Sequence, residues 1–252
     1  MTGRGIEMET LRMTCNCEGS EHTTSRRAAM GGAIGMGLLA GLPLAAMAQS
    51  TTQVRKDIPS PDQAIDMLMA GNKRFIDGDM LPHDHITTRE KLDAGQQPIA
   101  AVIRCADSRS APEVIFDQGI GDLFVCAVAG NVPTDELIAS IEYSVAVLKT
   151  PLIVVMGHSK CGSVDESLKN FNDIEALPGR LPSLISQILP AAIQAGGKPG
   201  DEALVNAIRY NVQNGMRRMP TVSSIISGAV ESGSVKIVGG VYDMPSGRFE
   251  MV

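Results

Sequence analysis

Two short segments of the chain contain residues that can bind a metal ion and accept a proton. Cys105, Asp107 and Arg109 alternate with small residues, and His158 and Cys161 lie three residues apart between two glycines. Two thiolates, an imidazole and a carboxylate make a ligand set of borderline softness, which favours tetrahedral zinc. Side chains two apart at a strand end, or three apart on one helical turn, project in the same direction. The spacing therefore predicts one zinc site shared by both segments.

The cysteines also allow other interpretations. A disulfide between Cys105 and Cys161 is an alternative in an exported protein. It would not explain why His158 and Asp107 accompany the two cysteines at the spacing of metal ligands. A thiol-redox protein is a second alternative, which metal analysis of the purified chain would distinguish from a zinc protein. Cys126 lies in an apolar run and is expected to be a buried strand residue.

The elements around the two segments place both at the same edge of a sheet, where they can meet if their strands are neighbours. Four apolar runs are typical of buried strands, at residues 98–103, 123–128, 151–156 and 234–239. Helical patterns cover residues 61–77, 88–94, 134–149, 163–170, 183–195 and 201–230, the last broken near Pro220, and a final short strand follows a turn at 245–247. This alternation predicts a single-domain α/β fold, with a mainly parallel central sheet flanked by helices and an N-terminal helical extension. The first and third runs end at the two reactive segments, and carboxyl ends of parallel strands share one edge.

Composition restricts the class of protein. The chain has 252 residues, of which 44% are hydrophobic and 20% charged, as in ordinary globular proteins. Its net charge of −6 and pI near 5.3 argue against a nucleic-acid partner. Five cysteines are too few for a disulfide scaffold of this length.

The N-terminal segment has the pattern of an export signal. Arg26 and Arg27 precede an uncharged, Gly- and Ala-rich run over residues 28–48 that ends in Ala-Met-Ala. Twin arginines, a weakly hydrophobic run and a small-residue cleavage site predict a twin-arginine (Tat) signal peptide, cleaved after Ala48. The alternative is an uncleaved membrane anchor. Cleavage would place the mature chain in the periplasm, after export of the precursor by the Tat machinery.

The resulting organisation has three parts. Residues 1–48 are the predicted signal peptide, residues 49–59 a polar linker, and residues 60–252 one folded domain.

Taken together, the two reactive segments resemble those of the β class of carbonic anhydrases. The resemblance covers roughly residues 62–244. Besides the metal segments it includes Gly71-Asn72, Gln96-Gln97-Pro98, Gly121-Asp122, Ala129-Gly130-Asn131 and Gly239-Gly240. The domain at 60–252 is accordingly expected to be a β-carbonic anhydrase domain.

This resemblance implies a zinc lyase that reversibly hydrates CO2 to bicarbonate and a proton. Cys105, His158 and Cys161 would hold one Zn²⁺ per subunit, and zinc-bound hydroxide would attack CO2. Asp107 and Arg109 would act as a catalytic dyad. Asp107 would either occupy the fourth position on zinc or turn to Arg109, so the resemblance leaves its role as a metal ligand open.

The resemblance also implies substrate and subunit contacts. Gln96 and Gly162 correspond to positions that line the substrate pocket, and Gln96 would reach it across a subunit interface. A homodimer or tetramer is therefore expected.

Two other functions fit the same residues. A hydrolase of the same fold could act on CS2 or COS, because attack on a linear heterocumulene is the same chemistry. A non-catalytic zinc- or bicarbonate-binding protein is the other, although the presence of both Asp107 and Arg109 favours an enzyme.

Overall fold

The computed structural model describes residues 57–252. The predicted signal peptide, its cleavage site and most of the predicted linker lie outside this range. Among the described residues, no helix combines the length and the apolar character needed to cross a membrane.

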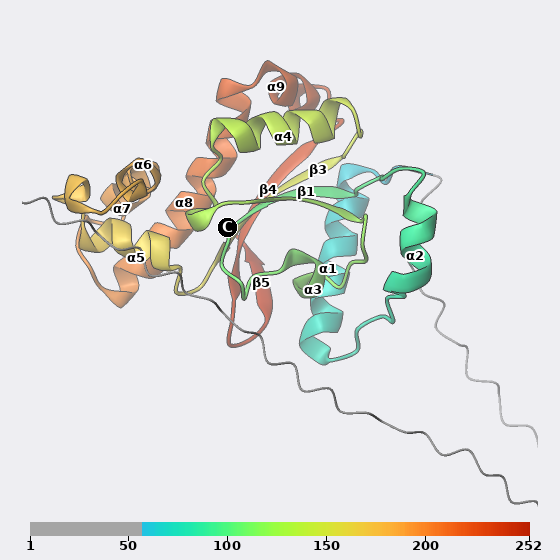
Figure 1. Ribbon diagram of the computed structural model, residues 1–252, viewed down its shortest axis with the longest axis horizontal. Coiled ribbons are helices and arrows are strands. Elements are labelled where there is room, and N and C mark those ends of the chain that lie inside the picture. The colour runs from blue at the N-terminus through green and yellow to red at the C-terminus, as the bar shows by residue number, and fades with distance from the viewer. Residues whose placement is uncertain (1–56) are drawn as a thin grey trace, which may run out of the picture. The chain divides into compact units, whose positions relative to one another are not determined.

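The centre of the molecule is a five-stranded sheet in the order β2-β1-β3-β4-β5 (Figure 1). Its strands are β1 Ala100–Arg104, β2 Leu123–Ala127, β3 Leu152–His158, β4 Lys236–Asp243 and β5 Arg248–Met251. The first four are parallel and β5 is antiparallel to β4. The predicted α/β fold with a mainly parallel sheet is confirmed.

Two strands extend further than the apolar runs indicated. β3 continues to His158, which pairs with Tyr242, and β4 passes through Gly239 and Gly240 to Asp243. Glycine weakens an isolated strand, but here the ladder between β3 and β4 continues across it. One predicted metal ligand, His158, therefore belongs to the sheet itself.

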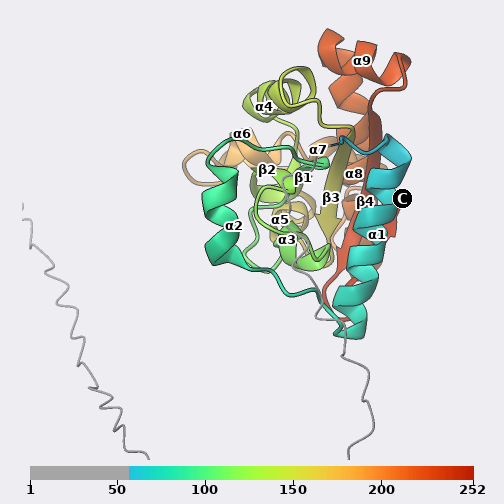
Figure 2. The same ribbon diagram turned by 90° about the vertical axis from the view of Figure 1, so that its right-hand side faces the viewer.

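Helices cover the sheet on both faces (Figures 1 and 2). They are α1 Pro61–Asp77, α2 His85–Leu92, α3 Pro112–Ile115, α4 Asp135–Ala146, α5 Gly162–Lys169, α6 Leu181–Ile185, α7 Leu189–Gln194, α8 Asp201–Val222 and α9 Ser224–Glu231, with 3₁₀ turns at Ala129–Asn131 and Ile174–Ala176. Residues of α1 and α3 pack on one face with Val102 of β1, while α4, α8 and α9 pack on the other with Ile103. Alternation along a strand explains this division.

Three helix predictions needed correction. The segment 183–195 forms two short helices, α6 and α7, because Pro190 in the first turn of α7 begins a new helix. The break expected near Pro220 lies at Ser223, whose hydroxyl caps α9 by accepting a hydrogen bond from Ile226 N. Asp84 caps α2 in the same way, so that this helix begins at His85 instead of Thr88.

Gly71 marks a close approach between α1 and the end of α3. A Cβ added to Gly71 would overlap the carbonyl oxygen of Phe116, which is backbone and has little freedom to move. Gly71→Ala is therefore expected to lower the free energy of unfolding by about 2–3 kcal/mol, as overpacking does. Gly228→Ala is the matched control, because Gly228 lies in helix α9 with open space around it. Urea unfolding should show the control unchanged or more stable by about 0.5–1 kcal/mol. Equal stability of both variants would contradict this packing.

A buried carboxylate ties α1 to the loop before α2. The Asp117 side chain is fully buried, and it accepts hydrogen bonds from Arg74 Nε at 2.5 Å and Leu81 N at 3.1 Å. His83 Nε2 lies 2.8 Å from the other carboxylate oxygen. Burial alone would raise the pKa of Asp117, but the hydrogen bonds from Arg74, His83 and Leu81 outweigh it, and the pKa is lowered.

This network predicts a pH-dependent stability. A carboxylate whose pKa is lower in the folded state stabilises the fold above its unfolded pKa of about 3.9, and the stabilisation is lost as the pH falls through the folded value. Asp117→Asn keeps a residue that tolerates the positive φ of 47°. The Asp117→Asn substitution should lower the free energy of unfolding at pH 7 by about 2–3 kcal/mol. This loss is smaller than the loss expected when a fully buried ion pair is broken, because Arg74 stays partly solvated. Chemical unfolding between pH 7 and 3 should show the difference from wild type shrinking below pH 4. A constant difference would contradict the prediction.

Candidate metal centre

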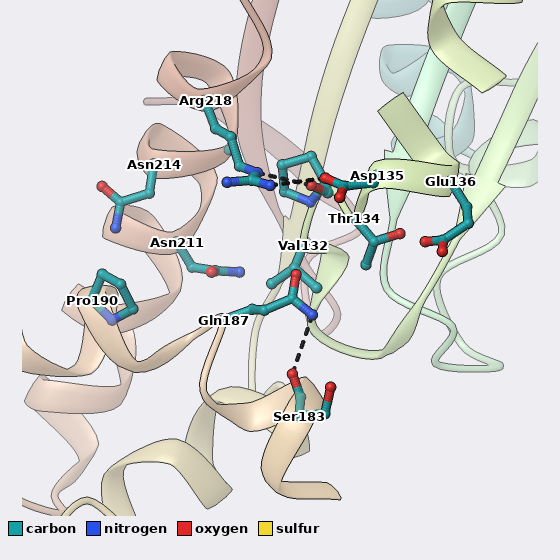
Figure 3. A pocket seen from close by; sticks show the side chains of 12 residues that line it. Val132, Thr134, Asp135, Glu136, Ser183, Gln187, Pro190, Asn211, Asn214 and Arg218 are labelled. Carbon is teal, nitrogen blue, oxygen red and sulfur yellow. Dashed lines mark hydrogen bonds and ion pairs between the residues drawn. The ribbon is translucent and has the colours of Figure 1, made fainter. Parts of the chain in front are cut away.

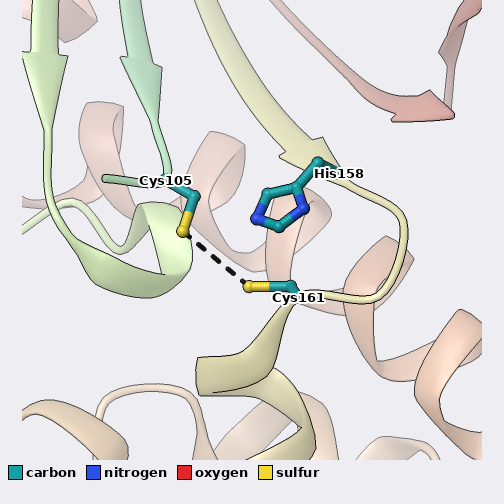
Figure 4. Close-up of side chains that lie close together, drawn as sticks. All are labelled: Cys105, His158 and Cys161. Atoms are coloured by element: carbon teal, nitrogen blue, oxygen red, sulfur yellow. Dashed lines mark hydrogen bonds between the residues drawn. The ribbon is translucent and has the colours of Figure 1, made fainter. Parts of the chain in front are cut away.

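The three sulfur and nitrogen ligands predicted from the sequence meet at one edge of the sheet. Cys105 follows β1 directly, His158 ends β3, and Cys161 is the N-cap residue of α5 (Figure 4). β1 and β3 are hydrogen-bonded parallel neighbours, so their carboxyl ends lie side by side. The turn that brings Cys161 back contains Lys160 in the left-handed region, with φ 54°.

The distances fit one metal ion. The candidate ligand atoms of Cys105, His158 and Cys161 all lie within 4.8 Å of one another, and all three residues are buried. The two Sγ atoms are 3.9 Å apart and both cysteines are free thiols, so the alternative of a disulfide is not what the structure contains. Two thiolates on tetrahedral zinc, each at about 2.3 Å, would be separated by about 3.8 Å.

The imidazole is oriented for coordination. His158 Nδ1 is 2.9 Å from the backbone oxygen of Ser159, to which it can donate a hydrogen bond. Its Nε2 is buried and has no hydrogen-bond partner among the described residues. A buried ring nitrogen without a partner is costly unless it binds something, and the Nδ1 bond selects the tautomer that leaves Nε2 free for a metal. The residues present therefore fit zinc.

Beside the cluster, Asp107 and Arg109 form a bidentate ion pair. Arg109 donates from Nε to Asp107 Oδ1 at 2.9 Å and from Nη2 to Oδ2 at 2.7 Å, and its backbone N–H also donates to Oδ1. Asp107 Oδ2 lies 3.9 Å from His158 Nε2. The carboxylate thus lies next to the cluster while it is held by Arg109. Its predicted role as a metal ligand stays a prediction.

Charges within the cluster explain the pKa shifts of its members. The pKa of Cys105 is lowered, chiefly because its thiolate accepts a hydrogen bond from the Cys161 thiol, and the pKa of Cys161 is raised by that same bond and by burial. Burial would lower the pKa of His158, but the negative Cys105 outweighs it and the net shift is upward. The Arg109 guanidinium holds the pKa of Asp107 well below its usual range. A metal ion would replace these shared protons.

Three hydrogen bonds that no sequence pattern indicated hold the loop after β1 and its cysteine. Arg104 donates from Nη1 to the Cys105 carbonyl at 2.7 Å, and the buried Ser110 hydroxyl donates to the Asp107 carbonyl at 2.9 Å. Gly130 N–H donates to Cys105 Sγ at 3.3 Å. The Ala-Gly-Asn pattern at 129–131 is part of the family resemblance, but nothing in its spacing indicates a bond to a residue 25 positions away.

Two predicted substrate residues lie at different distances from the cluster. Gly162 follows Cys161 directly and is exposed at the first position of α5. Gln96 is exposed on the loop between α2 and β1, and within residues 57–252 it makes no hydrogen bond to the cluster. Its expected position at a subunit interface stays a prediction. Cys126, in contrast, is buried in β2, and burial raises the pKa of its thiol to about 11.

The fold and the site together define an α/β metalloenzyme class. Three buried ligands meet beside an ionised carboxylate at the carboxyl edge of a parallel sheet, and three protein ligands are typical of catalytic zinc sites, whereas structural zinc sites have four.

Comparison with known proteins identifies the family within this class. The family model described as carbonic anhydrase matches residues 100–249. Carbonic anhydrase 2 of Mycobacterium tuberculosis is 38% identical over 190 residues, which are 75% of this chain and 91% of that protein. The carbonic anhydrase of Mycolicibacterium smegmatis is 37% identical over 193 residues, 76% of this chain and 93% of the relative.

Solved structures agree with this result. The β-carbonic anhydrase CafA of Aspergillus fumigatus has a TM-score of 0.61 and 28% identity, covering 67% of this chain and 82% of its own. A tetrameric β-carbonic anhydrase of Sordaria macrospora has a TM-score of 0.58 and 26% identity, with coverage of 76% and 94%. The chain belongs to the carbonic anhydrase family, in its β class.

Proposed function

We propose that this chain is a zinc enzyme that catalyses the reversible hydration of CO2 to bicarbonate and a proton. The observation that carries the proposal is the buried Cys105–His158–Cys161 cluster with an ionised, arginine-held carboxylate at its edge. The curated relatives that align over most of this chain are named carbonic anhydrases.

The residues of the site have two separate roles: three would bind the metal and two would orient the reactants. Cys105 Sγ, Cys161 Sγ and His158 Nε2 would hold zinc. When bound, zinc supplies the Lewis acidity that makes water a nucleophile near neutral pH. The hydrogen bond available between His158 Nδ1 and Ser159 O keeps the ring fixed, so that Nε2 stays directed at the ligand position.

Asp107 and Arg109 would orient the nucleophile. Because Arg109 lowers the pKa of Asp107, the carboxylate stays ionised through the neutral range and can only accept hydrogen bonds. Its Oδ2 lies 3.9 Å from His158 Nε2, where it would accept a hydrogen bond from a water held at the cluster and so orient that water toward CO2. The side chains of Arg109 and Asp107 are 58% and 18% exposed, so this edge of the site reaches the surface of the subunit, whereas the three candidate ligands are buried.

Stopped-flow CO2 hydration by the purified protein, together with its zinc content, tests the proposal. About one zinc per subunit and rapid hydration are expected. Parallel assays with CS2 and COS decide the substrate: faster turnover of either would replace CO2 as the substrate of the same site. Zinc without turnover of any of the three would support a non-catalytic binding protein instead.

We further propose that the active enzyme is a homodimer or a tetramer in which Gln96 lines the pocket of the adjacent subunit. The exposed position of Gln96 and a related enzyme described as tetrameric support this. Light scattering should give two or four times the subunit mass. Gln96→Ala should raise KM for CO2 while the mass of the oligomer stays as in the wild type. A fully active monomer would exclude the shared pocket.

Export through the Tat system is proposed from the sequence alone. Arg26 and Arg27, the apolar run after them and the Ala-Met-Ala ending support it. Mass spectrometry of the periplasmic protein should find Gln49 as the first residue. Changing both arginines to lysine should leave the full precursor in the cytoplasm; unchanged export would exclude this route.

A further inference from the structure

A buried amide of helix α8 lies behind the metal centre. Asn211 is only 4% exposed, and its Nδ2 donates a hydrogen bond of 2.7 Å to the carbonyl oxygen of Gly130. A cavity of about 730 Å³ opens beside it. Figure 3 shows the Asn211 side chain directed from α8 toward the segment that carries Val132, two residues beyond Gly130.

Gly130 connects this amide to a metal ligand. Its own N–H donates to Cys105 Sγ at 3.3 Å. The residue has φ 75°, in the left-handed region, and a Cβ there would overlap the side chain of Ile188. A residue with a side chain could not adopt this conformation in this place, and here the Gly130 carbonyl accepts from Asn211 while its N–H donates to the sulfur.

Helix α8 is itself fixed against the strands. A Cβ on Gly157 would lie 2.7 Å from the Val212 side chain, and one on Gly239 would lie 2.5 Å from it. The absence of side chains at these glycines allows α8 to pack directly on β3 and β4 next to His158. The same turn of helix thus contacts the strand that carries His158 and, through Asn211, the loop that bonds to Cys105.

We propose that Asn211 is a positioning residue of the metal centre. Its amide holds Gly130 so that the Gly130 N–H donates to the Cys105 sulfur. That bond directs a lone pair of the thiolate toward the shared ion and withdraws charge from the sulfur. Nothing in this role requires Asn211 to touch substrate. The inference rests on the proposed zinc centre and assigns to it a supporting residue 106 positions from Cys105 in the sequence.

NMR of the full-length protein loaded with ¹¹³Cd tests this without an activity assay. Cadmium accepts the same thiolate and imidazole ligands. In the wild type, the amide proton of Gly130 should show scalar coupling to ¹¹³Cd through the N–H···S bond. In Asn211→Leu, which is similar in size and has no donor, the coupling should be lost, and zinc affinity should fall about 10–100-fold.

Asn214→Leu is the matched control. Asn214 lies one turn further along α8 and lines the same cavity, but it bonds to Gln194 and Arg217 instead of the Gly130 loop. Its variant should keep the coupling and the wild-type affinity. If Asn211→Leu does not fold, Asn211→Ala provides the same test, since it removes the donor without adding bulk or charge.

The outcomes separate this inference from the proposed function. Cadmium whose chemical shift excludes two thiolate ligands would overturn the metal centre and the inference with it. Cadmium bound by two thiolates without coupling to Gly130, or coupling and affinity that survive in the Asn211 variants, would overturn the inference alone.

Discussion

Replacing Asp107 with asparagine is expected to lower kcat/KM for CO2 hydration by about 10²-fold or more, because the group that orients the nucleophile is lost. The amide is similar in shape, but it carries no charge and presents a donor where the carboxylate accepts hydrogen bonds. Zinc content should stay near one per subunit, because Cys105, His158 and Cys161 are intact. Stopped-flow assays and metal analysis of the same sample measure both quantities.

Two further variants test whether Asp107 acts with Arg109. Because the two side chains form one bidentate unit, Arg109→Leu should also reduce the rate, and the double variant should be little worse than Asp107→Asn alone. Asp135→Asn is the control, since Asp135 forms an ion pair with Arg218 on the surface and is 87% exposed. It should change the rate less than about twofold. Nearly wild-type activity in Asp107→Asn would remove the dyad from the mechanism.

Cys161→Ser is expected to abolish zinc binding and to lower kcat/KM by about 10³-fold or more, the equivalent of several kcal/mol of lost Lewis-acid catalysis. Serine replaces a thiolate with a hydroxyl of high pKa, which is a poor zinc ligand. The residue is 1% exposed and the two side chains are similar in size, so the fold should persist. Zinc analysis and circular dichroism distinguish metal loss from unfolding.

Cys126→Ser is the matched control for a buried thiol. Cys126 lies in β2 and does not belong to the cluster. The variant should keep its zinc and its activity, and lose about 1–3 kcal/mol of stability if the buried hydroxyl lacks a partner. Retention of zinc by the Cys161 variant, or its loss from the Cys126 variant, would show that the metal is bound elsewhere.

Local patterns in the sequence were enough to predict the elements and the ligand types. The serine, proline and aspartate at 60–62 predicted a helix beginning at Pro61, and α1 begins there, with a capping box between Ser60 and Gln63. Apolar runs predicted the strands that lead to Cys105 and His158. The chemical character of two thiolates and an imidazole predicted zinc, because softness and spacing are properties of the residues themselves.

Local patterns could not predict interactions that depend on strand order and helix packing. Nothing near Cys105 in the sequence indicates that β1 pairs with β3 as well as with β2. Because β1 and β3 are neighbours, the sulfurs of Cys105 and Cys161 lie 3.9 Å apart, although 56 positions separate them in the sequence. Nothing in the sequence around His83 indicates the buried Asp117 network, because the partners of Asp117 come from other elements.

Residue types and their periodicity are encoded along the chain, and so the sequence by itself determined the strands, most helices and the set of candidate ligands. Only the tertiary structure decided which ligand atoms meet, that Arg109 holds Asp107 beside them, and that Asn211 supports Gly130 from behind. The physical reason is that these contacts join backbone and side-chain groups from separate elements. Their distances depend on how the whole sheet and its helices pack, which no local window of sequence contains.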